Sequence, residues 1–139
     1  MAMTSLGFGE TRETERRALQ CVVTLACIVP ISAGAYGLFF GPSMLGGHQI
    51  ASAGLDGHFR YLSGLLLGLG LAFLASVPDI ESRGSRIALL TGMVMLGGFG
   101  RLASVIALGG GSRSAYFALA MELLVTPAVA LWQRRIARL

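Results

Sequence analysis

The sequence has 139 residues, of which 54% are hydrophobic and 13% are charged, and its formal net charge is +4. Soluble domains carry about 25% charged residues, so this composition excludes an ordinary soluble domain and indicates a small, single-domain integral membrane protein. The basic residues flank apolar stretches and form no separate patch, which argues against a nucleic-acid partner.

Four apolar stretches approach the length of about 20 residues that a helix needs to cross a membrane. In chain order they are Ala18–Phe40, His58–Val77, Ile87–Leu108 and Ala115–Trp132. Their continuous Ala-, Leu- and Gly-rich character differs from the alternating pattern of membrane strands. The sequence therefore predicts an all-α bundle of four transmembrane helices. We expect a polar leader over residues 1–17, the membrane domain over 18–135 and a basic tail over 136–139.

Breakers and capping residues separate these stretches. The expected loops are Gly41–Gly57, Pro78–Arg86 and Gly109–Ser114. Pro42 and Pro78 are expected to end the first and second helices, and Asp56 and Ser85 to cap the second and third.

Small and cyclic residues also lie inside the spans. Pro30 is expected to kink the first helix, and Pro127 to bend the fourth. Gly64 and Gly68 form a small-xxx-small step, for which Gly37 of the first helix is an expected neighbour.

The first span has the three parts of a signal peptide, but its apolar run continues to Phe40, so we expect it to be retained. The leader, Met1–Glu15, is expected to be a loose or amphipathic start. Cys21 and Cys27 are separated by about 9 Å of helical rise, so we expect free thiols and no disulfide. No spacing of Cys and His indicates a metal site.

Arginine is distributed unequally between the two sides of the predicted membrane domain. One side carries Arg12, Arg16, Arg17, Arg83, Arg86, Arg134, Arg135 and Arg138, and the other only Arg60 and Arg113. The positive-inside rule then places both termini and the Pro78–Arg86 loop in the cytoplasm. There the arginines are expected to attract anionic lipid headgroups.

Two charged residues, Arg101 and Glu122, lie within apolar spans. A charge in hydrocarbon costs several kcal/mol unless it is paired, so we predict that they bind each other. Helical rise puts them at similar depth in the outer leaflet, where Asp56, His58 and Arg60 enter from the second helix. We therefore expect one cluster from three helices.

The cluster has two interpretations. Its charges sum to zero with His58 neutral, as in a structural salt-bridge network. Alternatively it binds a ligand in a pocket whose predicted walls are Phe59, Tyr61, Gly64 and Gly97. Each residue also has a simpler structural interpretation. Arg60 would extend to the lipid headgroups, Asp56 would cap its helix, and His58 would lie at the membrane interface.

The residues around this cluster resemble a known family. Asp56-Gly-His-Phe-Arg-Tyr-Leu-Ser-Gly64 opens the second helix, Gly97-Gly-Phe-Gly-Arg-Leu-Ala-Ser104 follows in the third, and Glu122-Leu-Leu-Val-Thr-Pro127 in the fourth. The arrangement is similar to the bacterial four-helix membrane proteins catalogued as domain of unknown function 4345. The resemblance implies a multi-pass protein of the bacterial inner membrane. It also supports one site made of Asp56, His58, Arg60, Arg101, Ser104 and Glu122.

Three classes of function fit these observations. The first is binding of an apolar or amphiphilic ligand, or a role as accessory subunit of a membrane complex. The second is an oligomeric transporter that uses Arg101 and Glu122 as a gated pair, although no internal repeat is visible. The third is a membrane enzyme that uses His58, for which no nucleophile motif is present. No pattern names a catalytic residue or a cofactor, and the first class is the best supported.

Overall fold

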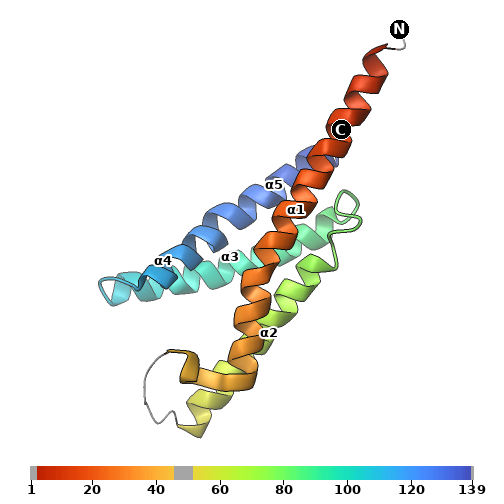
Figure 1. Cartoon of the computed structure of the whole chain (residues 1–139). Coiled ribbons are helices and arrows are strands. Elements are labelled where there is room, and N and C mark those ends of the chain that lie inside the picture. Colours follow the sequence, from red (N-terminus) through yellow and green to blue (C-terminus); the bar gives the residue numbers. More distant parts are fainter. Residues whose placement is uncertain (1–2, 46–51, 139) are drawn as a thin grey trace. The chain divides into compact units, whose positions relative to one another are not determined.

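The computed structural model describes residues 3–45 and 52–138. The elements are α1 (Met3–Phe40), η1 (Gly41–Leu45), α2 (Ala53–Leu74), α3 (Gly84–Ala107), α4 (Arg113–Ala120), η2 (Met121–Val125) and α5 (Thr126–Ile136) (Figure 1). Four helical stretches are long and apolar enough to cross a membrane: Gly9–Ser43, Ala53–Leu74, Gly84–Ala107 and Arg113–Ile136. No strand occurs in the described ranges. The predicted all-α fold with four spans is confirmed.

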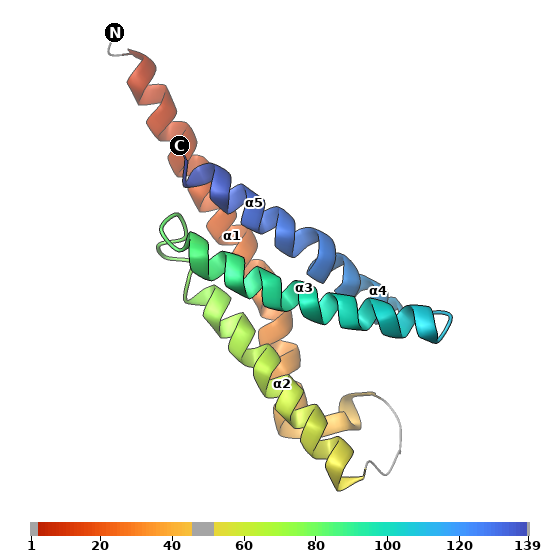
Figure 2. The ribbon, with the colours of Figure 1, turned by 180° about the vertical axis from the view of Figure 1, so that it is seen from behind.

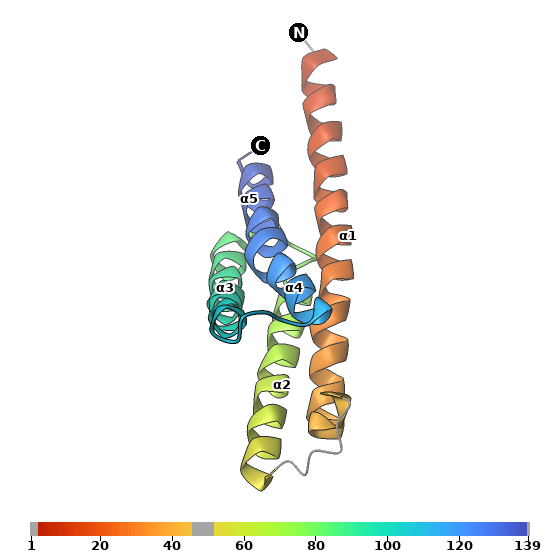
Figure 3. The ribbon, with the colours of Figure 1, turned by 90° about the vertical axis from the view of Figure 1, so that its left-hand side faces the viewer.

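The chain divides into two compact units. The first unit comprises Met1–Gln20 and Pro78–Leu139, and the second comprises Cys21–Val77. Within the first unit, α3 runs antiparallel to the fourth span, which consists of α4, η2 and α5 (Figure 2). Within the second unit, the later part of α1 packs against α2 (Figure 3). The helix α1 therefore contributes to both units.

The beginnings of two helices differ from the prediction. Ser52 caps α2, because its hydroxyl oxygen accepts a hydrogen bond from the backbone N–H of Leu55 (3.3 Å). Asp56 is therefore no cap and lies within the first turn, free to pair with another side chain. The helix α3 begins at Gly84 without a side-chain cap, so the cap predicted at Ser85 is also wrong.

Both prolines inside spans are accommodated. The helix α1 continues through Pro30. The fourth span passes Pro127 by a turn of π-helix, Met121–Val125, directly before it. Because proline has no N–H, it interrupts the ladder of helical bonds. Here the hydroxyl and the backbone N–H of Thr126 both donate to the carbonyl of Met121, which holds the wider turn.

The predicted leader is helical where it is described. The helix α1 begins at Met3, so the leader and the first span form one continuous helix. Three parts of the chain lie outside the described residues. They are Met1 and Ala2 of the predicted leader, residues 46–51 of the predicted Gly41–Gly57 loop, and Leu139 of the predicted tail.

The close approach of α1 and α2 depends on glycines of α1. A Cβ atom at Gly34 would lie 2.6 Å from the backbone nitrogen of Leu67 and 2.8 Å from the carbonyl oxygen of Ser63. The predicted small-xxx-small step of Gly64 and Gly68 does not form this contact. A Cβ atom at Gly68 would meet nothing within 4 Å, and a Cβ atom at Gly64 would meet only Leu38, at 3.7 Å. A glycine has only a hydrogen in place of a side chain, so two helix backbones can approach closely there, and in this contact the glycine belongs to α1.

Replacing Gly34 by alanine is expected to destabilise the second unit, because the methyl group would collide with backbone atoms of α2. Overpacking of this kind costs about 1–3 kcal/mol, whereas Gly68→Ala is expected to be neutral or slightly stabilising through its helix propensity. Thermal unfolding of both variants in one detergent measures the difference. Equal melting temperatures would contradict the contact.

Candidate functional site

In the second unit, Arg60 closes the end of α1. Its Nε donates to Asp56 Oδ2 (2.7 Å), and its Nη1 donates to the carbonyl oxygens of Leu38 (2.9 Å) and Phe39 (2.8 Å). The last carbonyls of a helix have no partner within the helix, and a cation satisfies both their hydrogen bonding and the negative end of the helix dipole. Arg60 is thus bound from three sides and has a structural role.

Gly41 makes room for this arrangement. Its φ of +63° is a left-handed conformation, which suits the residue that ends a helix. A Cβ atom here would lie 2.6 Å from Asp56 Oδ1 and 2.9 Å from Arg60 Nη2. The Asp56–Arg60 pair therefore packs directly against the backbone that leaves α1.

In the first unit, Arg101 of α3 binds Glu122 of η2. Arg101 Nε and Nη2 lie 3.0 Å from Glu122 Oε2 and Oε1, respectively, which is a two-pronged ion pair. The Arg101 side chain is 43% exposed and that of Glu122 20%. Arg101 lies about 9 Å from the C-terminal end of α3, so the pair is within the apolar part of the span. The predicted pairing of these two residues is present.

The backbone positions this pair closely. Glu122 lies in the π-turn, a distortion that is frequent at functional sites. A Cβ atom at Gly98 would lie 3.0 Å from Glu122 Cβ and 2.8 Å from Leu123 Cδ2. Gly98 is thus the glycine that lets η2 approach α3, whereas a Cβ atom at Gly97 would meet nothing within 4 Å. The two differ because successive helical residues point about 100° apart.

Arg101 keeps unused hydrogen-bond donors. A guanidinium carries five N–H groups, and the pair with Glu122 uses two of them. None of the described residues accepts a hydrogen bond from the other three. Arg60 differs in its partners, because three of its donors bind Asp56 and two backbone carbonyls of α1.

The other predicted site residues are less engaged. His58, Tyr61 and Ser104 are exposed, and their side chains make no hydrogen bond to any described residue. Phe59 is half-buried, with its ring beside Gly37. The Asp56–Arg60 and Arg101–Glu122 pairs belong to different units, so the convergence of all these residues into one cluster stays a prediction.

A shallow, open apolar surface lies on α3. It has a volume of about 490 Å³ and is lined by Ala88, Leu89, Gly92, Met93, Met95, Leu96 and Phe99. It includes neither Gly64 nor Gly97, so the pocket predicted around Phe59 and Tyr61 also stays a prediction. Within the described ranges no three His, Cys, Asp or Glu side chains gather as a metal site would require.

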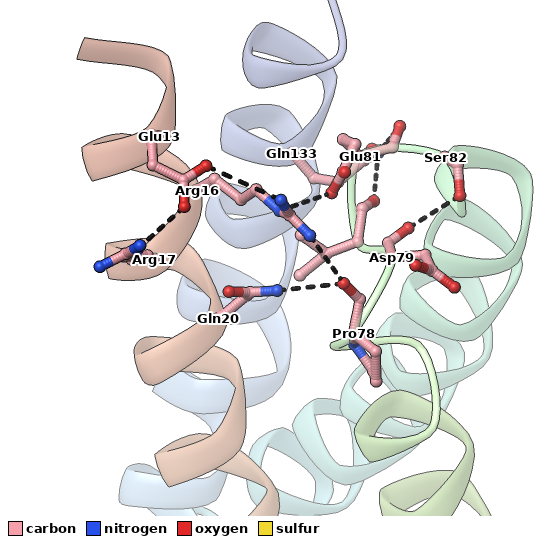
Figure 4. A network of polar contacts seen from close by, with 10 residues as sticks. Glu13, Arg16, Arg17, Gln20, Pro78, Asp79, Glu81, Ser82 and Gln133 are labelled. Atoms are coloured by element: carbon pink, nitrogen blue, oxygen red, sulfur yellow. Dashed lines mark hydrogen bonds and ion pairs between the residues drawn. The ribbon is translucent and has the colours of Figure 1, made fainter. Parts of the chain in front are cut away.

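A polar network joins the start of α1 to the loop between α2 and α3 (Figure 4). Arg16 Nη2 donates to the carbonyl oxygen of Pro78 (3.0 Å), and Gln20 Nε2 donates to the same oxygen (3.2 Å). Arg16 Nε also forms an ion pair with Glu81 Oε2 at 3.1 Å, in a geometry that is not a hydrogen bond. From α5, Gln133 is 1% exposed and donates to the carbonyl oxygens of Ile80 (2.9 Å) and Glu81 (3.3 Å).

Glu15 extends this contact to the end of the fourth span. Its carboxylate accepts hydrogen bonds from Trp132 Nε1 (3.4 Å) and Arg135 Nη2 (3.2 Å). Leu19 and Ile80 are fully buried, and in the sequence they neighbour Gln20 and Glu81 of this network. Sequence analysis missed this network, because no periodicity relates a carboxylate in the leader to a tryptophan more than a hundred residues later. The only local signal is Gln133, an uncharged polar residue at a position that packs inward.

Comparison with known proteins identifies the family. The family model described as "Domain of unknown function (DUF4345)" matches residues 18–133. The chain belongs to this family. The match covers the second and third spans and most of the first and fourth spans of this DUF4345 protein. It includes the Asp56–Arg60 and Arg101–Glu122 pairs, and it begins after Glu15 and Arg16. None of the curated proteins and none of the solved structures compared with the chain gives a significant match.

The Arg101–Glu122 pair can be measured by a double-mutant cycle. Arg101→Met and Glu122→Gln each leave one partner unpaired, so the double variant is expected to lose less stability than the sum of the single losses, with a coupling of about 0.5–3 kcal/mol. Thermal or denaturant unfolding in detergent gives the three values. Strictly additive losses would show that the pair contributes no coupling.

The contact of Gln133 with the loop predicts a second stability effect. Gln133→Leu removes the shorter of two hydrogen bonds to the carbonyl of Ile80, which then keeps only the 3.4 Å bond from the backbone N–H of Arg83. The loss is expected to cost about 0.5–1.5 kcal/mol. Arg134→Leu changes the neighbouring exposed residue and serves as the control, with little expected effect. Unfolding of both variants in the same detergent compares them, and a Gln133 variant as stable as the control would contradict a structural role of this bond.

Proposed function

We propose that this chain is a small multi-pass membrane protein that binds the polar head of an amphiphilic molecule at Arg101 and Glu122. The unused donors of Arg101 carry the proposal. In hydrocarbon each unsatisfied polar group costs several kcal/mol, so three free N–H groups favour a site that an acceptor occupies. The neighbouring spans expose apolar side chains such as Phe99 and Leu124, against which an apolar tail could lie.

The π-turn next to Pro127 also supports this site. It places Glu122 against α3 with the help of Gly98, and such turns are frequent at functional sites. Arg60 and Asp56 are better explained as the closure of α1, so we leave them out of the proposed site. Ser104, one turn after Arg101, remains a candidate member.

A role as accessory subunit of a membrane complex is the second candidate. The shallow apolar surface of α3, with Gly92 and Met93 among its residues, favours it, because a helix of a larger complex could pack there. In that case the acceptor for Arg101 would come from the partner protein. Co-purification distinguishes the two candidates, since a bound small molecule supports the first and a stoichiometric second chain the second.

For localisation we propose the bacterial inner membrane, with both termini in the cytoplasm. The arginines gathered near Arg16, Arg86 and Arg135 support this orientation by the positive-inside rule, and they would face anionic lipid headgroups. The polar network of Glu15, Arg16 and Gln133 would then lie on the cytoplasmic side.

Orientation is testable with single cysteines in a Cys21→Ala, Cys27→Ala background. A cysteine at exposed Ser82 is expected to be protected from a membrane-impermeant maleimide in intact cells, and one at exposed Arg113 to react. Permeabilised cells provide the control for reactivity. Labelling of position 82 but not 113 in intact cells would reverse the proposed orientation.

Ligand binding is testable by native mass spectrometry of the detergent-purified protein. Wild-type protein is expected to retain a small amphiphilic molecule that Arg101→Met loses. The matched control is Arg86→Met, the same change at an exposed arginine near the start of the same helix. If the Arg101 variant retains the same molecules as wild type and the control, the proposed site is wrong.

A further inference from the structure

The charge of the Arg101–Glu122 pair restricts what can bind beside it. The two-pronged contact, with both N–O distances at 3.0 Å, neutralises the guanidinium with the carboxylate. An arginine with no carboxylate beside it would attract an anion, but here the positive charge is already matched. The site therefore offers hydrogen-bond donors without offering a net charge.

We propose that the head of the bound amphiphile is uncharged and rich in hydrogen-bond acceptors, such as the ester and hydroxyl oxygens of an acylglycerol or the carbonyls of a quinone. This inference rests on the proposed binding site at Arg101 and Glu122. An anionic head would bring a second negative charge next to Glu122 and leave the site with a net charge in a medium of low dielectric constant. A cationic head would face the donors of Arg101 and could accept none of their hydrogen bonds.

Ser104 fits the same ligand chemistry. It lies three residues after Arg101, so both side chains share one face of α3. Its hydroxyl is exposed and makes no hydrogen bond to a described residue. A head with more than one oxygen could therefore accept from Arg101 and exchange a hydrogen bond with Ser104, while its chain follows the apolar surface of the span.

Three amphiphiles with the same oleyl chain separate the possibilities: monoolein, oleate and oleylamine. Binding to the purified full chain in a fixed detergent is measured by native mass spectrometry. Wild-type protein is expected to bind monoolein about tenfold or more tightly than either charged amphiphile, since misplaced charge at an interface costs several kcal/mol. Ser104→Ala is expected to weaken monoolein binding about fivefold, as the loss of one hydrogen bond would.

Glu122→Gln provides the decisive variant. It removes the negative charge and leaves Arg101 unmatched, so the preference is expected to move from monoolein to oleate. A melting curve checks that the variant is folded, and where it does not fold, the ranking of the three amphiphiles on wild-type protein decides.

The outcomes separate this inference from the function on which it rests. Tighter binding of oleate than of monoolein to wild-type protein, with loss of binding in Arg101→Met, would overturn the uncharged head and leave the binding site standing. Equal binding of all three amphiphiles to wild type and Arg101→Met would overturn both. Preference for monoolein together with its loss in Arg101→Met supports both.

Discussion

A guanidinium brings five N–H donors into a helix, and hydrocarbon offers no acceptor for them. The chain meets this constraint in different ways at Arg60 and at Arg101. Arg60 uses three of its five donors, one on Asp56 and two on carbonyls at the end of α1. Arg101 binds Glu122 with two donors and keeps three. Arg60 therefore binds the backbone at the end of α1, whereas Arg101 binds only Glu122 among the described residues and is the candidate binding residue.

The positions of both arginines depend on glycines that let backbones approach. Gly41 leaves α1 in a left-handed conformation and gives space to the Asp56–Arg60 pair. Gly98 admits the π-turn that carries Glu122. This π-turn lies directly before Thr126 and Pro127. One short segment therefore contains both the charged Glu122 and the proline that interrupts helical bonding.

The polar network at the loop between α2 and α3 has a different character. Glu15, Arg16 and Gln133 bind the loop backbone and the end of the fourth span, and they join segments distant in the sequence. Such contacts hold the first unit together where α1 enters it. They explain why the polar start of α1 is ordered helix over its described residues instead of a loose leader.

The sequence by itself determined the helical class, the four spans and the Arg101–Glu122 pairing, because hydropathy over about 20 residues and the cost of an unpaired charge are properties of local composition. Only the tertiary structure decided that Gly34 and Gly98, not Gly68 and Gly97, bring helices together. It also decided that Arg60 closes α1 and that Glu15 reaches Trp132. These contacts depend on the rotation of one helix against another and on side chains far apart in the chain. No periodicity in a single sequence encodes that rotation, since many pairings of small and polar residues have the same local pattern.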